Sequence, residues 1–294
     1  MKKEIGILGL GSMGTAIALN LKKKYKIFGY DINKHNKIKS SKNFFFVKNL
    51  KEIFLKTNIF IIIVLNENQC QKIFNKFIEI KKNLKITKKY TIINCTTVSP
   101  NWVKKIYKKL EKNNFDYIDC PVSGGPKKAI NGKLSLMLSS KKVTYKKNLA
   151  LLKNIGNNIY NLGNKIGTGS TVKIINNCLA GIQIVSAAEA ITLAKKEKIN
   201  LKKIFKIINN SSGQSWMFAD RGKRMIEKKY FKPLSRLSIF KKDMKLADQL
   251  RKKHFINLPL TKVALKMYKK GCKQGLENFD DSGVIRLLEK KVVN

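Results

Sequence analysis

A glycine-rich turn near the start of the chain constrains its fold most. The turn follows an apolar, strand-like stretch at residues 4–9 and precedes a helical pattern at about 12–23. In a strand–turn–helix unit the first glycine permits the tight turn, the second lets a pyrophosphate approach the backbone, and the third lets helix and strand pack closely. The helix N-terminus then favours the negative charge of the phosphates. This context predicts dinucleotide binding by six residues, Gly9, Leu10, Gly11, Ser12, Met13 and Gly14.

An acidic residue follows the next predicted strand, at residues 26–30. Asp31 stands about 20 residues beyond the first glycine, where a carboxylate accepts a hydrogen bond from the ribose of NAD and repels the 2′-phosphate of NADP. Lys34 and His35 follow closely and could accommodate a phosphate. We therefore expect NAD as the cofactor, with NADP as the alternative. A simple turn residue before Asn33 is the other interpretation of Asp31.

The hydrophobic pattern divides the 294 residues into two parts. In the first part, predicted strands alternate with predicted helices, which indicates a parallel sheet covered by helices. The strands are expected at 4–9, 26–30, 44–47, 59–65, 91–95, 115–119 and 134–139, and the helices at 12–23, 67–80, 100–112 and 142–153. Beyond Gly169 the long segments all have helical patterns, at 168–197, 200–210, 236–253, 259–275 and 282–290. We expect an α/β architecture: a Rossmann-type domain over 1–164 and an all-helical domain over 165–294, joined by a long helix.

The charge of the chain is unusual, at +44, from 62 Lys and Arg against 18 Asp and Glu. Such a charge often indicates a nucleic-acid or membrane partner. The basic residues are nevertheless spread along the whole chain, in groups such as Lys22–Lys24, and no single arm collects them. Ile, Asn, Lys and Phe, all encoded by A/T-rich codons, are abundant, so base composition is the simpler explanation. We expect no specific nucleic-acid partner, only weak and salt-sensitive binding to polyanions.

The cysteines and the apolar runs bear on the compartment. The five cysteines are odd in number and widely separated, without a CxxC pair, which predicts free thiols in a reducing cytoplasm and no metal site. The apolar run after Lys2 and Lys3 resembles a signal peptide, but four glycines interrupt it and no small-residue cleavage site follows. Nowhere does the sequence reach the roughly 18–20 uninterrupted apolar residues of a membrane span. The prediction is a cytoplasmic protein without a membrane partner.

The segment Gly167–Asn177 carries the strongest indication of chemistry. Lys173 and Asn177 are four residues apart, so on a helix they share one face, a turn from each other. The intervening residues include apolar ones, which predicts partial burial. Burial lowers the pKa of a lysine and lets it transfer a proton near neutral pH, and an amide can hold a hydroxyl or carbonyl group. In isolation, a core helix whose lysine extends to solvent is the favoured interpretation, and the motifs elsewhere in the chain argue against it.

Two loops follow predicted strands and would lie at the carboxyl edge of the sheet. Ser123, Gly124 and Gly125 follow the strand at 115–119, and successive backbone N–H groups in such a loop suit a carboxylate. A plain strand-to-helix turn is the alternative, although two glycines and two prolines shape this loop more than a connection requires. Thr97 follows the strand at 91–95 and is a candidate for contact with the nicotinamide.

Four motifs together resemble the β-hydroxyacid dehydrogenase family, which includes 3-hydroxyisobutyrate dehydrogenase and tartronate semialdehyde reductase. They occur in the family's order over essentially the whole chain: the glycine turn, Asp119 to Gly125 with its continuation to Leu134, Gly167 to Asn177, and Lys242 with Asp243. The segments Pro126–Ile130 and Phe231–Pro233 look most similar to the tartronate semialdehyde reductase branch.

The resemblance implies a role for each matching residue. Lys173 would be the catalytic acid/base, while Ser123, Gly124, Gly125 and Asn177 would bind the substrate. The nicotinamide site would be lined by Leu65, Asn66 and Thr97, and Lys242 would close over the cofactor from the helical domain. The implied reaction moves a hydride between NAD or NADP and a small carboxylate-bearing β-hydroxyacid or semialdehyde. The family also implies a homodimer or homotetramer, with the helical domain serving substrate binding and dimerisation.

Some positions depart from the family pattern without removing a reacting group. Asn66 stands where proline is usual, Ser139 and Ser140 where two glycines are usual, and Tyr25 where a glycine often ends the first helix. Three alternatives stay open. A 6-phosphogluconate dehydrogenase would carry histidine at the position of Asn176, an imine reductase would carry an acid or tyrosine instead of lysine at 173, and a non-catalytic polyanion-binding protein could reuse the fold.

Overall fold

The computed structural model describes residues 2–33 and 40–289. The chain divides into two compact units, Met1–Lys173 and Ile174–Asn294. The division falls inside one continuous helix, α7 (Thr168–Lys196), whereas the sequence pattern places the boundary between residues 164 and 165. The difference arises because the first turn of α7 is hydrogen-bonded to strands of the first unit, as described below.

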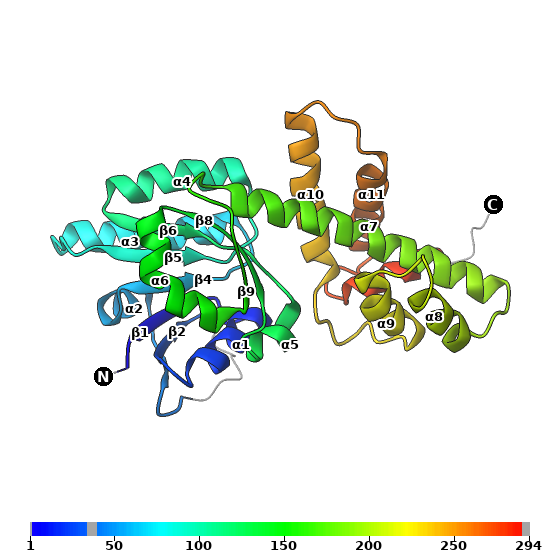
Figure 1. Cartoon of the computed structure of the whole chain (residues 1–294), viewed down its shortest axis with the longest axis horizontal. Coiled ribbons are helices and arrows are strands. Elements are labelled where there is room, and N and C mark those ends of the chain that lie inside the picture. The colour runs from blue at the N-terminus through cyan, green and yellow to red at the C-terminus, as the bar shows by residue number, and fades with distance from the viewer. Residues whose placement is uncertain (1, 34–39, 290–294) are drawn as a thin grey trace. The chain divides into compact units, whose positions relative to one another are not determined.

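The first unit contains a sheet of nine strands among the described residues, in the order β3-β2-β1-β4-β5-β6-β8-β7, with β9 beside β8 (Figure 1). The strands are β1 (Glu4–Leu8), β2 (Lys26–Tyr30), β3 (Phe44–Phe46), β4 (Ile59–Ile62), β5 (Tyr90–Asn94), β6 (Phe115–Asp119), β7 (Val122–Ser123), β8 (Ser135–Ser140) and β9 (Asn158–Asn161). The order reverses between β1 and β4. Ligands of such sheets bind beyond the carboxyl ends of the strands at this reversal.

Helices cover both faces of this sheet (Figure 1). Residues of α1, α5 and α6 pack into one apolar core, and residues of α2, α3 and α4 pack into the other. The bounds are α1 (Ser12–Leu21), α2 (Leu50–Lys56), α3 (Glu67–Asn83), α4 (Pro100–Lys112), α5 (Gly125–Ile130) and α6 (Lys142–Ile155). Strands β4 and β5 are buried along their whole length, as their unbroken apolar sequences predict.

The α/β fold with a dinucleotide-binding type of sheet is confirmed, with differences at its later strands. Strands β1 to β6 are parallel, but β8 runs antiparallel to β6 and β7, so the sheet is only mostly parallel. The sequence pattern also missed β9, whose residues are mostly exposed and polar, and the short helices α2 and α5. Elements this short leave little room for a hydrophobic period.

In the second unit the described residues form helices, with one isolated β-bridge between Arg236 and Asp280. The helices pack around an apolar core that includes Ile184, Met244 and Tyr268. A π-helical turn and α9 were not predicted. After α7 come α8 (Leu201–Asn209), the π-helical turn (Phe218–Gly222), α9 (Lys223–Ile226), α10 (Leu237–Lys253), α11 (Pro259–Lys273), a 3₁₀ turn (Asp281–Ile285) and α12 (Arg286–Glu289).

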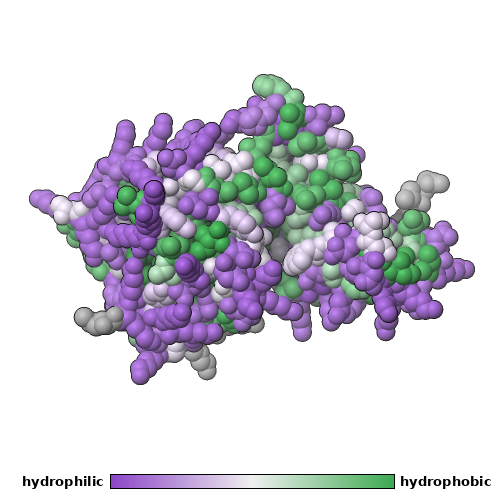
Figure 2. Space-filling view, in the orientation of Figure 1, coloured by the Kyte–Doolittle hydropathy of each residue, from purple (hydrophilic) through white to green (hydrophobic). Residues whose placement is uncertain are grey.

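Helix α7 is long and apolar enough to cross a membrane by length and composition alone. Half of its most apolar stretch is nevertheless buried within the protein, and Ile184, Ala188 and Ile191 belong to the core of the second unit. These properties are typical of a core helix. Hydrophilic side chains cover much of the visible face of both units, while apolar side chains gather over α10 and α11 (Figure 2).

Candidate active site

The glycine-rich turn between β1 and α1 has the geometry that its sequence predicts. Gly9 has a φ of +93°, and a Cβ atom there would lie 2.3 Å from the carbonyl oxygen of Ile63. At Gly14 a Cβ atom would lie 1.8 Å from the carbonyl oxygen of Gly9. A Cβ atom at Gly11 would meet no described atom within 4 Å, so the space before the N-terminus of α1 is open. This open approach fits the pyrophosphate of a dinucleotide.

Asp31 lies directly after β2 and is hydrogen-bonded to the glycine-rich turn. Its Oδ2 atom accepts a hydrogen bond from the backbone N–H of Leu10 at 2.6 Å, and its Oδ1 atom accepts one from Asn33 N–H at 2.8 Å. The carboxylate therefore lies beside the predicted phosphate-binding turn. It also stabilises the turn at residues 31–33. Lys34 and His35, which could accommodate a phosphate, lie outside the described residues.

The loops after β4 and β5 hold the residues assigned to the nicotinamide. Leu65 is half-exposed, and its N–H donates to the Oε1 atom of Gln69 at 2.8 Å. Asn66 caps α3, because its Oδ1 atom accepts a hydrogen bond from Gln69 N–H at 3.0 Å. Asn66, at the position where the family pattern predicts proline, therefore stabilises the N-terminus of α3. Thr97 is half-buried, and the neighbouring Thr96 hydroxyl accepts a hydrogen bond from Val64 N–H at 3.1 Å, which joins the two loops.

The loop assigned to the substrate carboxylate connects β7 to α5. Ser123 ends β7 and pairs with Ser135 of β8. Gly124 and Gly125 follow with φ values of +133° and +71°, a region that side chains rarely adopt. All three residues are partly accessible. The double glycine thus serves a backbone shape that an ordinary strand-to-helix turn does not need.

Asp119 ends β6 as a fully buried carboxylate and binds the first turn of α7. Its oxygens accept hydrogen bonds from Ser170 Oγ at 2.6 Å, Ser170 N–H at 2.9 Å and Ser139 Oγ at 3.2 Å. Burial raises the pKa of Asp119 to about 6, and the serine hydrogen bonds oppose that rise. The carboxylate is therefore mostly ionised at neutral pH. The sequence pattern included Asp119 in a motif but gave it no role; an acid at the end of an apolar strand was the available signal.

Lys173 and Asn177 lie one turn apart on α7, as their spacing predicts. Lys173 is 7% exposed and Asn177 is 9% exposed, whereas Ile175 and Asn176 between them are exposed. The pair therefore occupies the buried face of the helix. The alternative in which the lysine extends freely to solvent does not hold for Lys173.

A second buried carboxylate, Asp243 of α10, holds two of the predicted site residues. Asn177 donates its Nδ2 hydrogen to Asp243 Oδ2 at 2.7 Å, and Lys242 Nζ lies 2.9 Å from Asp243 Oδ1. Sequence reasoning named the Lys242–Asp243 pair but assigned a function to the lysine alone. Because the partner of Asp243 is distant in sequence, only the burial of an acid on an otherwise apolar helix face could have indicated its role.

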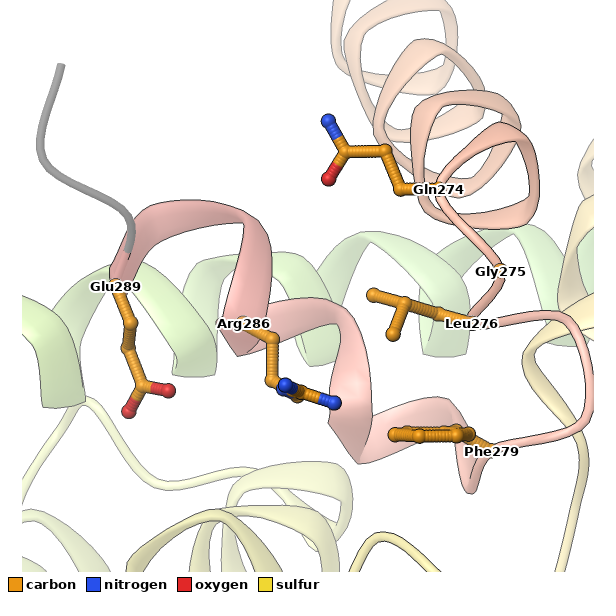
Figure 3. A pocket seen from close by; sticks show the side chains of 6 residues that line it. All are labelled: Gln274, Gly275, Leu276, Phe279, Arg286 and Glu289. Atoms are coloured by element: carbon orange, nitrogen blue, oxygen red, sulfur yellow. The ribbon is translucent and has the colours of Figure 1, made fainter. Parts of the chain in front are cut away.

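A separate cavity of about 300 Å³ lies in the second unit and contains none of the predicted site residues (Figure 3). Arg286 extends over the ring of Phe279, 5.3 Å from its centroid, and Glu289 forms an ion pair with Lys195. These polar groups are therefore engaged in the fold. Among the described residues, no cluster of three or more His, Cys, Asp or Glu side chains could hold a metal ion.

Two family models match the chain. The model described as the NAD binding domain of 6-phosphogluconate dehydrogenase matches residues 4–163, which is more than half of the chain. The model described as NAD-binding of NADP-dependent 3-hydroxyisobutyrate dehydrogenase matches residues 167–288. Both descriptions name a nicotinamide dinucleotide, in agreement with the open glycine-rich turn.

Individual relatives match over nearly the full length. L-threonate dehydrogenase of Escherichia coli K12 is 31% identical over 97% of this chain and 94% of its own length. The 2-hydroxy-3-oxopropionate reductase of the same organism is 26% identical over 97% of both chains. The crystal structure of a 3-hydroxyisobutyrate dehydrogenase from Salmonella typhimurium is 29% identical, covers 97% of this chain and 99% of its own, and superposes with a TM-score of 0.86.

Proposed function

Since this chain belongs to the β-hydroxyacid dehydrogenase family and is an NAD(P)-dependent hydroxyacid dehydrogenase, we propose that Lys173 is its acid/base. When bound, the nicotinamide supplies or accepts the hydride. Lys173 removes the proton from the substrate hydroxyl during oxidation and donates a proton to the carbonyl oxygen during reduction. The burial of Lys173 on one face of α7 supports this role, because a buried amine exchanges protons in a site from which water is largely excluded.

The substrate in this proposal is a small acid bound through its carboxylate. Ser123 and the backbone N–H groups of Gly124 and Gly125 hold that carboxylate. Asn177 orients the reacting oxygen, and Asp243 fixes the Asn177 amide at 2.7 Å. The relatives' names favour acids of the L-threonate, 3-hydroxyisobutyrate or 2-hydroxy-3-oxopropionate type. Among these we favour the threonate type, because the relatives that carry its name have the higher identity.

We propose NAD as the preferred cofactor. The turn Gly9–Gly14 would hold the pyrophosphate, and Asp31 would hold the ribose, because its carboxylate stands 2.6 Å from the N–H of Leu10 in that turn. Leu65, Asn66 and Thr97 would line the nicotinamide, and Lys242 would close over the cofactor. A negative charge beside this turn disfavours the 2′-phosphate of NADP.

Assembly and compartment complete the proposal. Ile175, Leu179 and Leu193 are exposed apolar residues of α7, which is consistent with a homodimer or homotetramer that covers them. We propose the cytoplasm as the compartment, because the five cysteines form no disulfide with one another. Sedimentation velocity tests the assembly: a species of one chain mass would contradict it.

The buried pair Lys173 and Asn177 on one helix face carries the proposal, and initial rates test it. NAD⁺ and NADP⁺ would be assayed with L-threonate, 3-hydroxyisobutyrate and glycerate. NADH and NADPH would be assayed with the matching oxidised acids, which are a keto acid for threonate and semialdehydes for the other two. Lys173→Ala should lower kcat by about 10²–10⁴-fold with the substrate that turns over. Lys196→Ala, an exposed lysine of the same helix, is the matched control and should keep wild-type rates. Near-full activity of Lys173→Ala would refute the assignment.

A further inference from the structure

Three buried side chains, Asp119, Ser139 and Ser170, fasten the start of α7 to the sheet; we call them the serine–aspartate clamp. Ser170 donates both its N–H and its hydroxyl to Asp119, at 2.9 and 2.6 Å. Ser139 donates its hydroxyl to Asp119 at 3.2 Å and accepts the N–H of Gly169 at 3.3 Å. The clamp therefore satisfies two N–H groups of the first helical turn, which have no partner within a helix.

The helix approaches the sheet closely at this point. A Cβ atom at Gly169 would lie 2.4 Å from the carbonyl oxygen of Met137 and 2.9 Å from that of Asp119. Only a residue without a side chain lets the first turn lie against β6 and β8 at this separation. The contact therefore fixes both the distance of the turn from the strands and its rotation about the helix axis.

Lys173 follows Ser170 by three residues on the same helix, so the two lie on neighbouring positions of one face. A helix rises only about 1.5 Å per residue and is stiff over one turn. A shift or rotation of the first turn therefore moves Lys173 by a similar amount. Acid/base groups need placement within about 0.5 Å, and an error near 1 Å can lower a rate about 10²-fold.

Ser139 is the member of the clamp that comes from β8. Its hydroxyl is the clamp member that connects β8 to both the carboxylate and the helix, because it donates to Asp119 and accepts from Gly169. The hydroxyl of the adjacent Ser140 donates instead to the Lys141 carbonyl oxygen at 3.2 Å, and its backbone N–H donates to the Gly163 carbonyl oxygen. The two serines therefore differ in consequence although they are adjacent in sequence.

We infer that Ser139 and Asp119 are positioning residues of the reaction, which hold the first turn of α7 so that Lys173 meets the reacting oxygen. The inference rests on the proposed role of Lys173. Neither residue transfers a proton to substrate in this scheme: Asp119 and Ser139 act through Ser170 and Gly169, and Lys173 remains the group that touches the substrate.

The test compares Ser139→Ala with Ser140→Ala, a matched control of the same type and size. Ser139→Ala should lower kcat, normalised to the concentration of dinucleotide-binding sites, by about 10- to 100-fold. The dinucleotide Kd should not change, because other residues bind the dinucleotide. Deuterated NADH should show a larger primary isotope effect on kcat than in the wild type, because chemistry becomes slower. Ser140→Ala should stay within about twofold of the wild type in every measurement.

A readout independent of turnover accompanies these rates. Amide hydrogen exchange of Gly169 and Ser170, measured without cofactor, should accelerate in Ser139→Ala while exchange in the middle of α7 does not change. A merely structural role would reduce the number of folded binding sites and leave both the rate per site and the isotope effect unchanged. That result, or equal effects of Ser139→Ala and Ser140→Ala, would overturn the inference.

Failure of the proposed function gives a different pattern. If the wild type turns over and Lys173→Ala does not, but Ser139→Ala equals the wild type, only the clamp inference is wrong. If Lys173→Ala also keeps its rate, the acid/base assignment itself is wrong. Should Ser139→Ala not fold, Ser139→Gly removes the same hydroxyl, and the same outcomes apply.

Discussion

The carboxylate of Asp243 holds the amide of Asn177, the residue that we propose orients the reacting oxygen of the substrate. It accepts the Asn177 amide hydrogen at 2.7 Å and pairs with Lys242 at 2.9 Å, in a buried position on α10. Asp243→Ala removes the acceptor that fixes the amide. We expect kcat/KM for the acid substrate to fall about 10- to 100-fold, the effect of 1–3 kcal/mol for a buried polar partner.

Asp248→Ala is the control for this prediction. Asp248 lies on the same helix and pairs with Arg251 at 2.8 Å, but no residue of the proposed site contacts it among the interactions described for it. Steady-state kinetics should show near-wild-type values for Asp248→Ala. Equal losses in the two variants would mean that the helix as a whole, rather than the Asn177 contact, sets the activity.

Two glycines of the dinucleotide turn should respond to alanine in different ways. Gly14→Ala would place a Cβ atom 1.8 Å from the Gly9 carbonyl oxygen, so folding itself should suffer. Gly11 has a φ of −64° and open space around its Cβ position, so the unfolding midpoint of Gly11→Ala should change little. Its methyl group would instead obstruct a pyrophosphate, and dinucleotide Kd should rise at least tenfold. Urea unfolding and NADH fluorescence titration separate the effects; unchanged Kd in Gly11→Ala would contradict this account.

The placement of single residues in the fold could be predicted from the sequence where the signal was local. The glycine turn and the pair Lys173 and Asn177 depend on spacing along one strand–turn–helix unit or one helix, and such spacing is visible in the sequence. The bonds of Asp119 to Ser170 and of Asp243 to Asn177 join residues far apart in the chain. Their partners depend on how elements pack, which a single sequence does not display.

At the scale of elements, hydrophobic content decided what could be predicted. The apolar segment around Phe60 predicts a central strand, and β4 is buried throughout. The direction of β8 was not predictable, because its residues are buried on both faces and a parallel or antiparallel partner would suit the same pattern. Strand β9 has only exposed or partly exposed residues and forms through pairing with β8, so its own sequence carries little signal.

A buried ion pair connects the π-helical turn (Phe218–Gly222) to the 3₁₀ turn (Asp281–Ile285). Arg221 of the π-helical turn pairs with the fully buried Asp281, with a second contact from Nη2 to Oδ2 at 3.2 Å. Burial raises the pKa of Asp281 to about 6, and the positive charge of Arg221 opposes that rise. The pair therefore keeps a carboxylate ionised inside the helical unit.

Arg221→Ala should destabilise the protein by about 3–5 kcal/mol, because it leaves a buried acid without its main counter-charge. Urea unfolding followed by circular dichroism measures the loss. The control is Lys223→Ala, which removes an exposed lysine at the edge of the same turn and should change the free energy of unfolding by less than about 1 kcal/mol. A loss in Arg221→Ala no greater than in Lys223→Ala would show that the ion pair contributes little.

At the scale of the whole molecule, the fold and the charge carry different information. The alternation of strands and helices and the later helical patterns predict the two-part architecture, and the helix α7 runs through both compact units. The net charge of +44 has no such structural explanation. Of the 62 Lys and Arg residues, only Lys173 and Lys242 belong to the proposed site. It bears instead on association with polyanions and on repulsion within the chain.

The salt dependence of DNA binding should show whether the basic surface has a function or only reflects the base composition of the gene. If the lysines only reflect base composition, duplex DNA should bind at about 20 mM salt without sequence preference, and log Kd should rise linearly with log salt, so that binding is negligible near 200 mM. Fluorescence anisotropy with two unrelated duplexes measures both properties. Saturating DNA at about 150 mM salt should leave the hydride-transfer rate unchanged. Tight binding that persists at 200 mM, or discriminates between the duplexes, would instead favour a polyanion-binding role for the surface beside the enzyme activity.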